Sequence, residues 1–370
     1  MAESAVRGGF SVSVLDGFCD QDTRAAASCR QIRFDAAGFD PAQLLTELAR
    51  LEPGRPLGMV YGAGLEATPS LLRRLSQRCK LFGNASAVLE LLADPAAYFN
   101  LLDSLQIPYP EVRYSPPERT TAKTWLVKKA GSSGGQGVTF WSAEQTATDP
   151  GCYYQRFIRG ETMSVLFIAD GESHQRIGYN RLKVSAARKS TPFLYSGAVG
   201  QMSLDPGLHQ HLERFVAKLV ERLHLRGVNS LDFILSKGKA YVLDLNPRPS
   251  ATLELYDHQV EAGWMKLHIQ ACLGKLPGVL PPAAATGVYG HLIVYAPRAL
   301  EIPAGMDWPA WTRDRPDSGT RIARGEPVCS LFARGRTAAE VETGLQQYRS
   351  RLPGMLSAPG AQRIADRHVT

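Results

Sequence analysis

Between residues 120 and 250 the chain carries short apolar segments in pairs, and this pairing constrains the fold more than any other feature. The pairs are "TWLVKK" with "GVTFW", "YYQRFI" with "MSVLFIA", and "LDFIL" with "AYVLDL". Apolar segments separated by a few turn residues are typical of antiparallel hairpins. The segment "GLHQHLERFVAKLVERLH" has helical spacing and precedes the last pair. We therefore expect antiparallel hairpins with one helix between them along the chain.

The first hundred residues follow a different pattern, in which strand and helix signals alternate. "FSVSVL", "LGMVYG" and "KLFG" have strand character, whereas "DQDTRAAASCR", "DPAQLLTELARLE", "TPSLLRRLSQR" and "SAVLELLADPAAYFNLLDSL" have helical spacing. This alternation is typical of a parallel α/β unit. Asp16, Gly62 and Gly64 follow strands, where such units place ligand-facing loops. No GxGxxG is present, so a nicotinamide cofactor has no support.

Two Pro-rich segments, "QIPYPEVRYSPPE" and "LGKLPGVLPPAAATG", divide the chain. We expect a Rossmann-like domain at 1–108, a central α+β domain at 109–275, and a β-rich C-terminal segment with a terminal helix at 276–370. In the central domain, a hairpin at about 120–150 would precede a larger sheet at about 150–275. The fold class is thus α/β combined with α+β.

Composition narrows the function classes. Among the 370 residues, 44% are hydrophobic and 21% are charged, and no apolar run is long enough to span a bilayer. The N-terminus lacks the pattern of a secretory signal, and six scattered cysteines without CxxC lead us to expect free thiols in a reducing cytoplasm. The net charge of +7 is dispersed, so we expect no nucleic-acid or membrane partner and favour an anionic small-molecule substrate.

The hairpin of "LDFILS" and "AYVLDLN" brings two carboxylates together. With Lys237-Gly238-Lys239 as its loop, Asp232 lies opposite Asp244 and Ile234 lies opposite Val242. The other, apolar face would hold Leu231, Phe233, Leu235, Tyr241, Leu243 and Leu245.

Opposed like charges are unfavourable unless a cation lies between them. Asn246 adds a neutral oxygen on the same face as Asp232 and Asp244. Two carboxylates and an amide oxygen suit Mg²⁺, which takes further oxygens from water and phosphates. The alternative is a pair of solvated acids on an exposed face.

The segment "WLVKKAGSSGGQGVTFW" contains a Gly-rich loop between two strands. Its backbone N–H groups can approach a polyphosphate closely, and Lys128 or Lys129 could reach the same phosphates. The alternative is a flexible surface hairpin. "GSSGG" also satisfies GxSxG with Ser133 as a nucleophile, but a hydrolase elbow needs a following helix, whereas "VTFW" has strand character.

The segment "YYQRFIRGETMSVLFI" joins two apolar strands. Phe157 and Ile158 could contact an adenine base, and Glu161 could accept hydrogen bonds from ribose hydroxyls. No HExxH is present, and we expect His209 and His211, in a helical segment, to be surface residues.

A Gly-rich hairpin after a strand lysine, an "F-I-x-G-E" segment and a final DxNPR occur here in the order that resembles the ATP-grasp superfamily. The resemblance covers about residues 10–275 and implies two sheets that clasp ATP after a Rossmann-like domain. It further implies an ATP-dependent carboxylate–amine (or carboxylate–thiol) ligase, with ATP and Mg²⁺ as cofactors and small-molecule partners. A non-catalytic nucleotide-binding protein and a small-molecule kinase are the alternatives.

The resemblance also implies roles for individual residues. Lys128 resembles the lysine that contacts the ATP phosphates, with Lys129 in place of a common Pro, and Arg248 resembles the arginine that steadies the reacting carboxylate. The ATP-binding set would be Ser133, Gly134, Gly135, Gln155, Phe157, Ile158 and Glu161. The Mg²⁺ ligands would be Asp232, Asp244 and Asn246. Gln155 and Asp244 stand where many members have Glu.

A second, weaker resemblance concerns the tyramine–glutamate ligases of methanofuran-type cofactor biosynthesis. It rests on "GYNRLKV", "YSG" and the tail "WPAWTRDRPDSGTRIARGEPVCSLFA". It implies that Asn180, Arg181 and Lys183 face an anionic acceptor, with an exposed polar turn as the alternative. The sequence does not identify the acid or the amine, and a homodimer is the default expectation.

Overall fold

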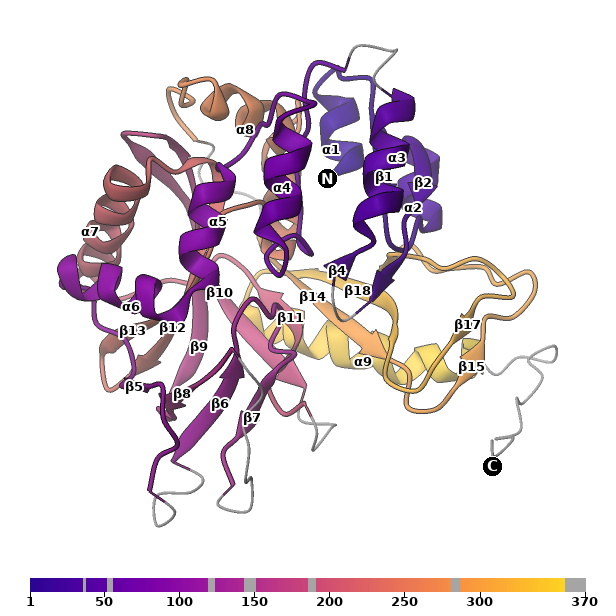
Figure 1. Cartoon of the computed structure of the whole chain (residues 1–370). Coiled ribbons are helices and arrows are strands. Elements are labelled where there is room, and N and C mark those ends of the chain that lie inside the picture. Colours follow the sequence, from indigo (N-terminus) through magenta and orange to yellow (C-terminus); the bar gives the residue numbers. More distant parts are fainter. Residues whose placement is uncertain are drawn as a thin grey trace.

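The computed structural model describes residues 1–35, 38–51, 56–118, 124–142, 151–185, 191–280 and 287–356. In the described residues, two antiparallel sheets follow an N-terminal α/β unit, and helices lie against both faces of the larger sheet (Figure 1). The expected fold class is therefore confirmed.

The N-terminal unit is held together by parallel contacts. β1 pairs with β2 in parallel, and Met59 forms a parallel bridge with Leu81. The segment expected as one helix at 86–105 is two helices, because Asp94 caps the second helix and Pro95 begins it. The elements are α1 (Ala2–Arg7), β1 (Ser13–Asp16), α2 (Gln21–Ala26), β2 (Ser28–Gln31), β3 (Phe34–Asp35), β4 (Gly38–Phe39), α3 (Pro41–Leu51), α4 (Pro69–Ser76), α5 (Ser86–Ala93) and α6 (Pro95–Ser104).

The small sheet has the order β5-β8-β6-β7. Its strands are β5 (Val112–Arg113), β6 (Trp125–Lys129), β7 (Val138–Phe140) and β8 (Cys152–Arg156). β6 and β7 pair in an antiparallel manner around the Gly-rich loop, which confirms that hairpin. The outer parts of the hairpin expected at about 120–150, namely 119–123 and 143–150, lie outside the described residues.

The large sheet has the order β13-β12-β9-β10-β11-β14-β18-β16, and all its pairings are antiparallel. Its strands are β9 (Glu161–Asp170), β10 (His174–Ser185), β11 (Leu194–Val199), β12 (Arg226–Ser236), β13 (Lys239–Asn246), β14 (Val288–Tyr295), β16 (Thr312–Arg313) and β18 (Pro327–Gly335). β15 (Leu300–Glu301) pairs separately with β17 (Arg321–Ile322). The C-terminal segment thus extends the sheet of the central domain.

The expected hairpin of "YYQRFI" with "MSVLFIA" is wrong. β8 belongs to the small sheet and β9 to the large one, so the connection at 157–160 crosses between sheets. Gly160 passes close to β12, where a Cβ would lie 2.3 Å from the Leu235 carbonyl oxygen. A crossing this tight requires glycine.

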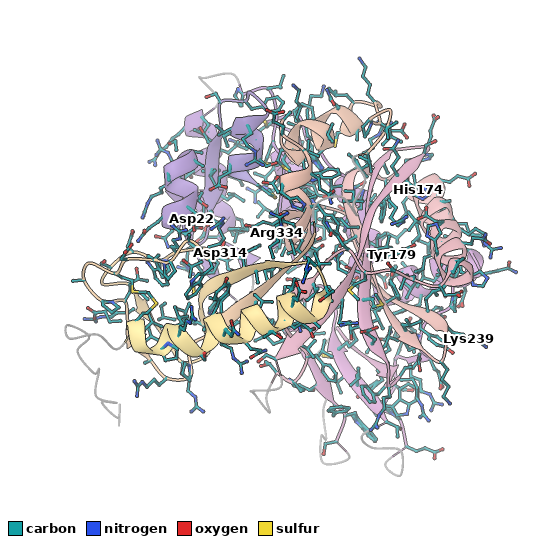
Figure 2. The ribbon with its side chains drawn as sticks, turned by 180° about the vertical axis from the view of Figure 1, so that it is seen from behind. Asp22, His174, Tyr179, Lys239, Asp314 and Arg334 are labelled. Atoms are coloured by element: carbon teal, nitrogen blue, oxygen red, sulfur yellow. A yellow bond between two sulfur atoms is a disulfide. The ribbon has the colours of Figure 1, made fainter. Side chains whose placement is uncertain are left out.

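We call the face of the large sheet that carries Ser164 and Asp232 the front face, and the opposite face the back face. Side chains alternate along β9, so that Met163 packs in the back-face core and Leu166 in the front-face core. On the back face lie α7 (Pro206–Leu223) and α9 (Ala338–Leu356), the latter crossing the sheet in Figure 2. On the front face lie the 3₁₀ helix η3 (Ala251–Gln259) and α8 (Trp264–Cys272). Among the described residues, no helix is both long and apolar enough to cross a membrane.

The α7 helix is well defined by its own sequence. Asp205 caps its N-terminus by accepting from the backbone N–H groups of Gly207 and Leu208, and Pro206 is its first residue. His224 ends it in a left-handed conformation with φ 50°. Apolar side chains at helical spacing pack into the back-face core, as the sequence predicts.

The β12–β13 hairpin places Asp232 opposite Asp244 as predicted, but by a different route. Its loop is Lys237-Gly238, two residues with φ of 50° and 75°, because Ser236 pairs with Lys239. A bulge at Leu243 then restores the opposition of the two acids.

Beyond the bulge, the expected pairing is wrong by one residue. Val242 lies opposite Phe233 rather than Ile234. In consequence Val242 and Ala240 join the back-face core, whereas Tyr241 and Leu243 do not.

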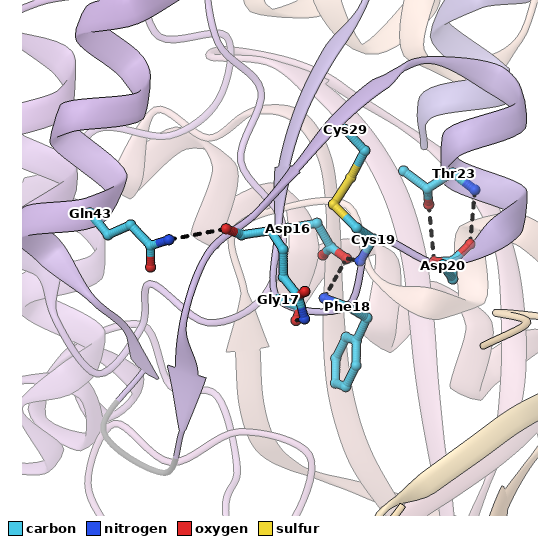
Figure 3. The surroundings of a disulfide bond; sticks show 9 residues. Asp16, Gly17, Phe18, Cys19, Asp20, Thr23, Cys29 and Gln43 are labelled. Atoms are coloured by element: carbon cyan, nitrogen blue, oxygen red, sulfur yellow. Dashed lines mark hydrogen bonds between the residues drawn. A yellow bond between two sulfur atoms is a disulfide. The ribbon is translucent and has the colours of Figure 1, made fainter. Parts of the chain in front are cut away.

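Cys19 and Cys29 form a disulfide (Figure 3), so the expectation of six free thiols is wrong for this pair. Cys19 follows β1 in a turn with φ 47°, in which Asp16 accepts from the N–H groups of Phe18 and Cys19. Helix α2 then returns the chain to β2, where Cys29 lies beside Val14 of β1. A separation of ten residues gives no CxxC signal. The other four cysteines form no disulfide.

Candidate active site

The end of the β12–β13 hairpin gathers acidic and amide side chains on the front face. Asp232 lies opposite Asp244 across the strands. Asn246 donates from Nδ2 to Oδ2 of Asp232 over 3.2 Å, and its Oδ1 accepts from Nη2 of Arg248 over 3.2 Å. The structure thus brings together the four predicted residues of this strand end, which we call the acidic cluster (Asp232, Asp244, Asn246 and Arg248).

The two carboxylates of the acidic cluster disfavour each other's ionised form. Burial raises the pKa of Asp232 to about 7, with the charge of Asp244 adding to the shift and Asn246, Arg248 and Lys128 opposing it. The surrounding protein also raises the pKa of Asp244, chiefly by desolvation, although its side chain opens to solvent. This pair needs additional positive charge to hold both negative charges at neutral pH.

Lys128 supplies part of that charge from the small sheet. Its Nζ donates to Oε1 of Gln155 over 3.3 Å and lies 5.6 Å from the ring centre of Tyr153. Burial lowers the pKa of Lys128, but Tyr153, Asp244 and Asp232 outweigh it and the net shift is upward. Lys129 points the other way on the strand and is exposed. Lys128 is therefore the lysine that faces the acidic cluster.

Glu66, which the sequence reasoning missed, holds Arg248 from the N-terminal unit. Arg248 is 7% exposed, and its Nε donates to Oε1 of Glu66 over 2.5 Å. The other oxygen of Glu66 accepts from the N–H of Gly64 over 2.6 Å. The sequence predicts that the loop with Gly62 and Gly64 faces a ligand. The presence of an acidic residue, Glu66, in that loop was the signal that could have identified it.

The N-terminal unit also fixes the backbone next to Arg248. The hydroxyl of Tyr61 donates to the Pro247 carbonyl over 2.9 Å, and Nδ2 of Asn84 donates to the same oxygen over 2.8 Å. Asn84 further bonds Oδ1 of Asn229 over 2.8 Å. Arg248 is thereby oriented by two units of the chain.

The Gly-rich loop is seated against the large sheet. The Gly134 carbonyl accepts from the N–H of Tyr195 over 2.8 Å, and a Cβ at Gly135 would lie 1.9 Å from the Phe193 carbonyl oxygen. Phe140, Phe157 and Phe193 form an aromatic cluster beside it. β7, not a helix, follows Ser133, as the argument against a hydrolase elbow requires.

Gln155 is buried between the sheets with spare hydrogen-bonding capacity. It is 1% exposed, and its Nε2 has no partner among the described residues. A buried, unpaired donor is costly unless a ligand or water completes it. Next along the chain, Phe157 and Ile158 are half-buried at the crossing between sheets. Nucleotide binding by Gln155, Phe157 and Ile158 stays a prediction that fits these positions.

Glu161 and two of the predicted acceptor residues lie away from the acidic cluster. Strand alternation puts Glu161 on the back face of β9, where its Oε1 pairs with Nε of Arg181. Lys183 donates to Oε1 of Glu342 on α9 over 2.6 Å. The ribose role of Glu161 stays a prediction, but the structure does not bring this residue to the front face.

Asn180 occupies the opposite face from Arg181, so the three predicted acceptor residues do not converge. It is fully buried, donates to Oγ of Ser164 over 3.1 Å, and accepts from the Tyr256 hydroxyl over 2.8 Å. Adjacent residues of a strand point to opposite faces, which the predicted grouping overlooked.

The donor set suits a hard cation in part. Asp232, Asp244 and Asn246 are oxygen ligands of the kind Mg²⁺ prefers, and within the described ranges no group of three or more His, Cys, Asp and Glu residues could hold a metal alone. Phosphate and water oxygens would have to complete the shell. Because Nδ2 of Asn246 faces Asp232, its amide must turn over for both to bind one cation.

Part of the chain that forms this geometry is similar to a known domain family. Residues 92–252 match the ATP-grasp domain family. The chain contains an ATP-grasp domain. Its large sheet carries the acidic cluster, and its small sheet carries Lys128.

The curated relatives of this ATP-grasp domain are distant. The large chain of carbamoyl phosphate synthase from Thermoanaerobacter pseudethanolicus is 22% identical over 261 residues, which cover 65% of this chain and 24% of that protein. The arginine-specific large chain from Bacillus subtilis is 21% identical over 240 residues, which cover 60% and 23%. The chain thus spans about a quarter of the length of these relatives.

Solved structures share the fold over nearly the whole chain. The biotin carboxylase domain of 2-oxoglutarate carboxylase from Hydrogenobacter thermophilus, solved with MgADP, ADP and bicarbonate, has a TM-score of 0.72 at 15% identity, covering 95% of this chain and 87% of that one. N5-carboxyaminoimidazole ribonucleotide synthetase from Thermus thermophilus has a TM-score of 0.69 at 16% identity, covering 96% of each. The likeness includes the C-terminal segment and shows the ATP-grasp fold.

Proposed function

We propose that this protein is an ATP-dependent ligase that activates a substrate carboxylate as an acyl phosphate and joins it to an amine. The observation that carries the proposal is the convergence of Asp232, Asp244 and Arg248 from the large sheet with Lys128 from the small sheet. Paired acids with raised pKa values beside two cations suit the transfer of a phosphoryl group.

In this mechanism, a carboxylate oxygen attacks the γ-phosphorus of ATP, and ADP leaves with the electron pair of the broken P–O bond. The amine then attacks the acyl carbon, a C–N bond forms, and inorganic phosphate leaves with the amine proton. Lys128 stabilises negative charge that develops on the transferred phosphoryl group, and Arg248 orients the acid. Mg²⁺ held by Asp232, Asp244 and a turned Asn246 would neutralise phosphate oxygens. Seating of the Gly-rich loop on β11 excludes water from the acyl phosphate.

The substrates are a finer proposal that rests on the second sequence resemblance. Glutamate as the acid and tyramine as the amine are the first pair to test. Bicarbonate is the second acid, because a solved structure with this fold contains bicarbonate together with MgADP.

The test is ADP release by the full chain with Mg²⁺, ATP and panels of acids and amines, with Asp244→Asn as the matched inactive variant. We expect ADP formation that requires an acid and coupled product that requires an amine. ATP binding without acid-dependent ADP would instead favour a nucleotide-binding protein. A phosphorylated product formed equally well without amine would favour a kinase. Failure of glutamate with tyramine alone would remove only that pair.

A further inference from the structure

Tyr195 of β11 lies on the front face of the large sheet, where the Gly-rich loop and β14 both contact it. Its backbone N–H donates to Gly134 of the Gly-rich loop over 2.8 Å, and its carbonyl accepts from the hydroxyl of Tyr295 over 2.7 Å. Its own hydroxyl lies 2.7 Å from Nε2 of His291 on β14. Tyr195 itself is partly buried.

His291 is a buried histidine that contacts the Tyr195 hydroxyl through one of its two ring nitrogens. It is 3% exposed, and its Nδ1 has no hydrogen-bond partner among the described residues. Burial lowers the pKa of His291 to about 4, so the ring is neutral at physiological pH. A neutral, buried imidazole that forms a hydrogen bond with a tyrosine hydroxyl fixes the position of that hydroxyl.

The charged surroundings of Tyr195 connect two sides of the site. The His291 ring lies 5.5 Å from that of Phe332, and Arg313 lies over Phe332 at 5.8 Å. Nε of Arg313 is 3.9 Å from Oε1 of Glu254, an accessible residue of η3. Burial raises the pKa of Tyr195, and the negative charges of Asp232 and Glu254 add to the shift. The hydroxyl therefore stays neutral and protonated under the influence of these two carboxylates.

We propose that Tyr195, positioned by His291, binds the incoming amine acceptor next to the acyl phosphate. This inference rests on the proposed ligase function and assigns its acceptor side to named residues. The hydroxyl accepts from or donates to the amine nitrogen as the C–N bond forms, the C–O bond to phosphate breaks, and phosphate takes the proton.

Because the loop that covers the phosphate side contacts the same tyrosine, acceptor binding and loop seating share one residue. When an amine binds to the Tyr195 hydroxyl, the backbone N–H of Tyr195 already donates to the Gly134 carbonyl. The C-terminal segment thereby contributes His291 to the second half of the reaction, which gives its extension of the sheet a chemical role.

The test separates the two halves of the reaction in the full chain. Hydroxylamine is a small nucleophile that traps acyl phosphates as hydroxamates without needing a shaped acceptor site. With glutamate as the acid, we expect Tyr195→Phe and His291→Leu to raise the KM for tyramine about tenfold, the loss of one hydrogen bond at about 1.4 kcal/mol. Hydroxamate formation should stay within about twofold of wild type. If another pair emerges from the ADP-release panel, that acid and amine replace these.

His291→Gln keeps a nitrogen or oxygen near the position of Nε2 and should restore most of the acceptor affinity, which a merely structural role would not produce. Tyr109→Phe, which removes a tyrosine hydroxyl bonded to Asp103 far from the front face, is the matched control. Equal losses in ligation and hydroxamate formation, or no loss in either, would overturn the assignment of Tyr195. No hydroxamate from the wild-type protein with any acid would instead overturn the ligase function itself.

Discussion

On the back face of the large sheet, Glu161 pairs with Arg181 and Glu342 pairs with Lys183, so each acid has a cation. On the front face, Asp232 and Asp244 lie opposite each other, and their pKa values are raised. By contrast, Lys183 and Arg181 lower the pKa of Glu342. Charges that satisfy each other on folding stabilise the fold, whereas charges left in conflict indicate a ligand that will resolve the conflict. The direction of the pKa shifts therefore distinguishes the candidate site from the rest of the sheet better than the number of charged residues does.

The largest expected effect concerns Asp244 on the front face. Asp244→Asn should lower acid-dependent ADP release by about 100-fold or more, because one of two anionic oxygens for the cation is lost. The thermal midpoint should not fall, since the change relieves repulsion with Asp232. Glu342→Gln on the back face is the matched control and should keep the ADP-release rate within about twofold, with a stability loss below about 1 kcal/mol. Equal rates for both variants would contradict the distinction between the faces.

Two histidines, one on each side of the large sheet, differ in the same way as the acids, and the pH dependence of stability tests this difference. On the back face, His174 lies 3.0 Å from Glu213, a carboxylate partner. On the front side, His268 is fully buried, and burial lowers its pKa to about 4. The unfolded chain therefore takes up this proton first, so stability is fully present above pH 6.5 and is lost as pH falls toward 4, by about 3 kcal/mol. Urea unfolding at pH 7 and pH 4.5 measures the loss.

His268→Asn provides the control for that pH dependence. Asn can still accept from the Val228 N–H, which donates to Nδ1 of His268 over 2.9 Å, but it does not titrate. We expect a less stable protein whose stability changes less between the two pH values. A slope equal to that of the wild type would show that His268 does not carry the effect.

Glu66 sharpens the comparison, because it is an acid that is paired and yet lies at the site. Glu66→Gln should lower kcat/KM for the acid about tenfold, since Arg248 loses its ionic partner while a hydrogen-bond acceptor remains. Glu90→Gln, which disturbs an ion pair with Arg73 in the same N-terminal unit, should have no effect on kcat/KM. Steady-state kinetics over a range of acid concentrations distinguishes them. An unchanged value for Glu66→Gln would remove this residue from the positioning of Arg248.

The smallest expected effect concerns Glu161. Glu161 lies on the back face, so Glu161→Gln should change the KM for ATP less than about threefold, because the variant loses only a surface ion pair. ATP-dependence curves for both proteins measure it. A rise of tenfold or more would show that Glu161 reaches the ribose, as the sequence resemblance implies, and that the back face is not purely structural.

Asp232, Asp244 and Asn246 could be predicted from the sequence because they lie within one hairpin, whereas the role of Arg248, beyond the end of β13, came from the family resemblance. The opposition of Asp232 to Asp244 was nevertheless reached through two compensating errors, a loop one residue too long and an unseen bulge at Leu243. A bulge depends on twist and packing, which period-two alternation does not encode. The same argument gave the wrong partner for Val242, where nothing compensated.

Longer-range features were beyond the sequence pattern. Glu66 reaches Arg248 across 182 positions, and Cys19 bonds Cys29 around a short helix. The segments "YYQRFI" and "MSVLFIA" have the alternation of a hairpin, yet they belong to different sheets, because a short connection does not specify whether it turns or crosses. Asn180 and Arg181 were grouped as neighbours in sequence, although a strand sends neighbours to opposite faces.

The pairing of β11 with β14 bears on how this chain can be cut and recombined. The expected boundary near 275 falls between two strands that share one hydrogen-bonded ladder. A fragment ending there would expose the edge of β11, a strand bearing Tyr195, and would invite pairing with other chains. The C-terminal segment is thus not a separable module, because exchanging it between relatives would replace β14, β18 and β16 of the large sheet. The strand whose edge protects the chain from aggregation is also the strand that bears Tyr195.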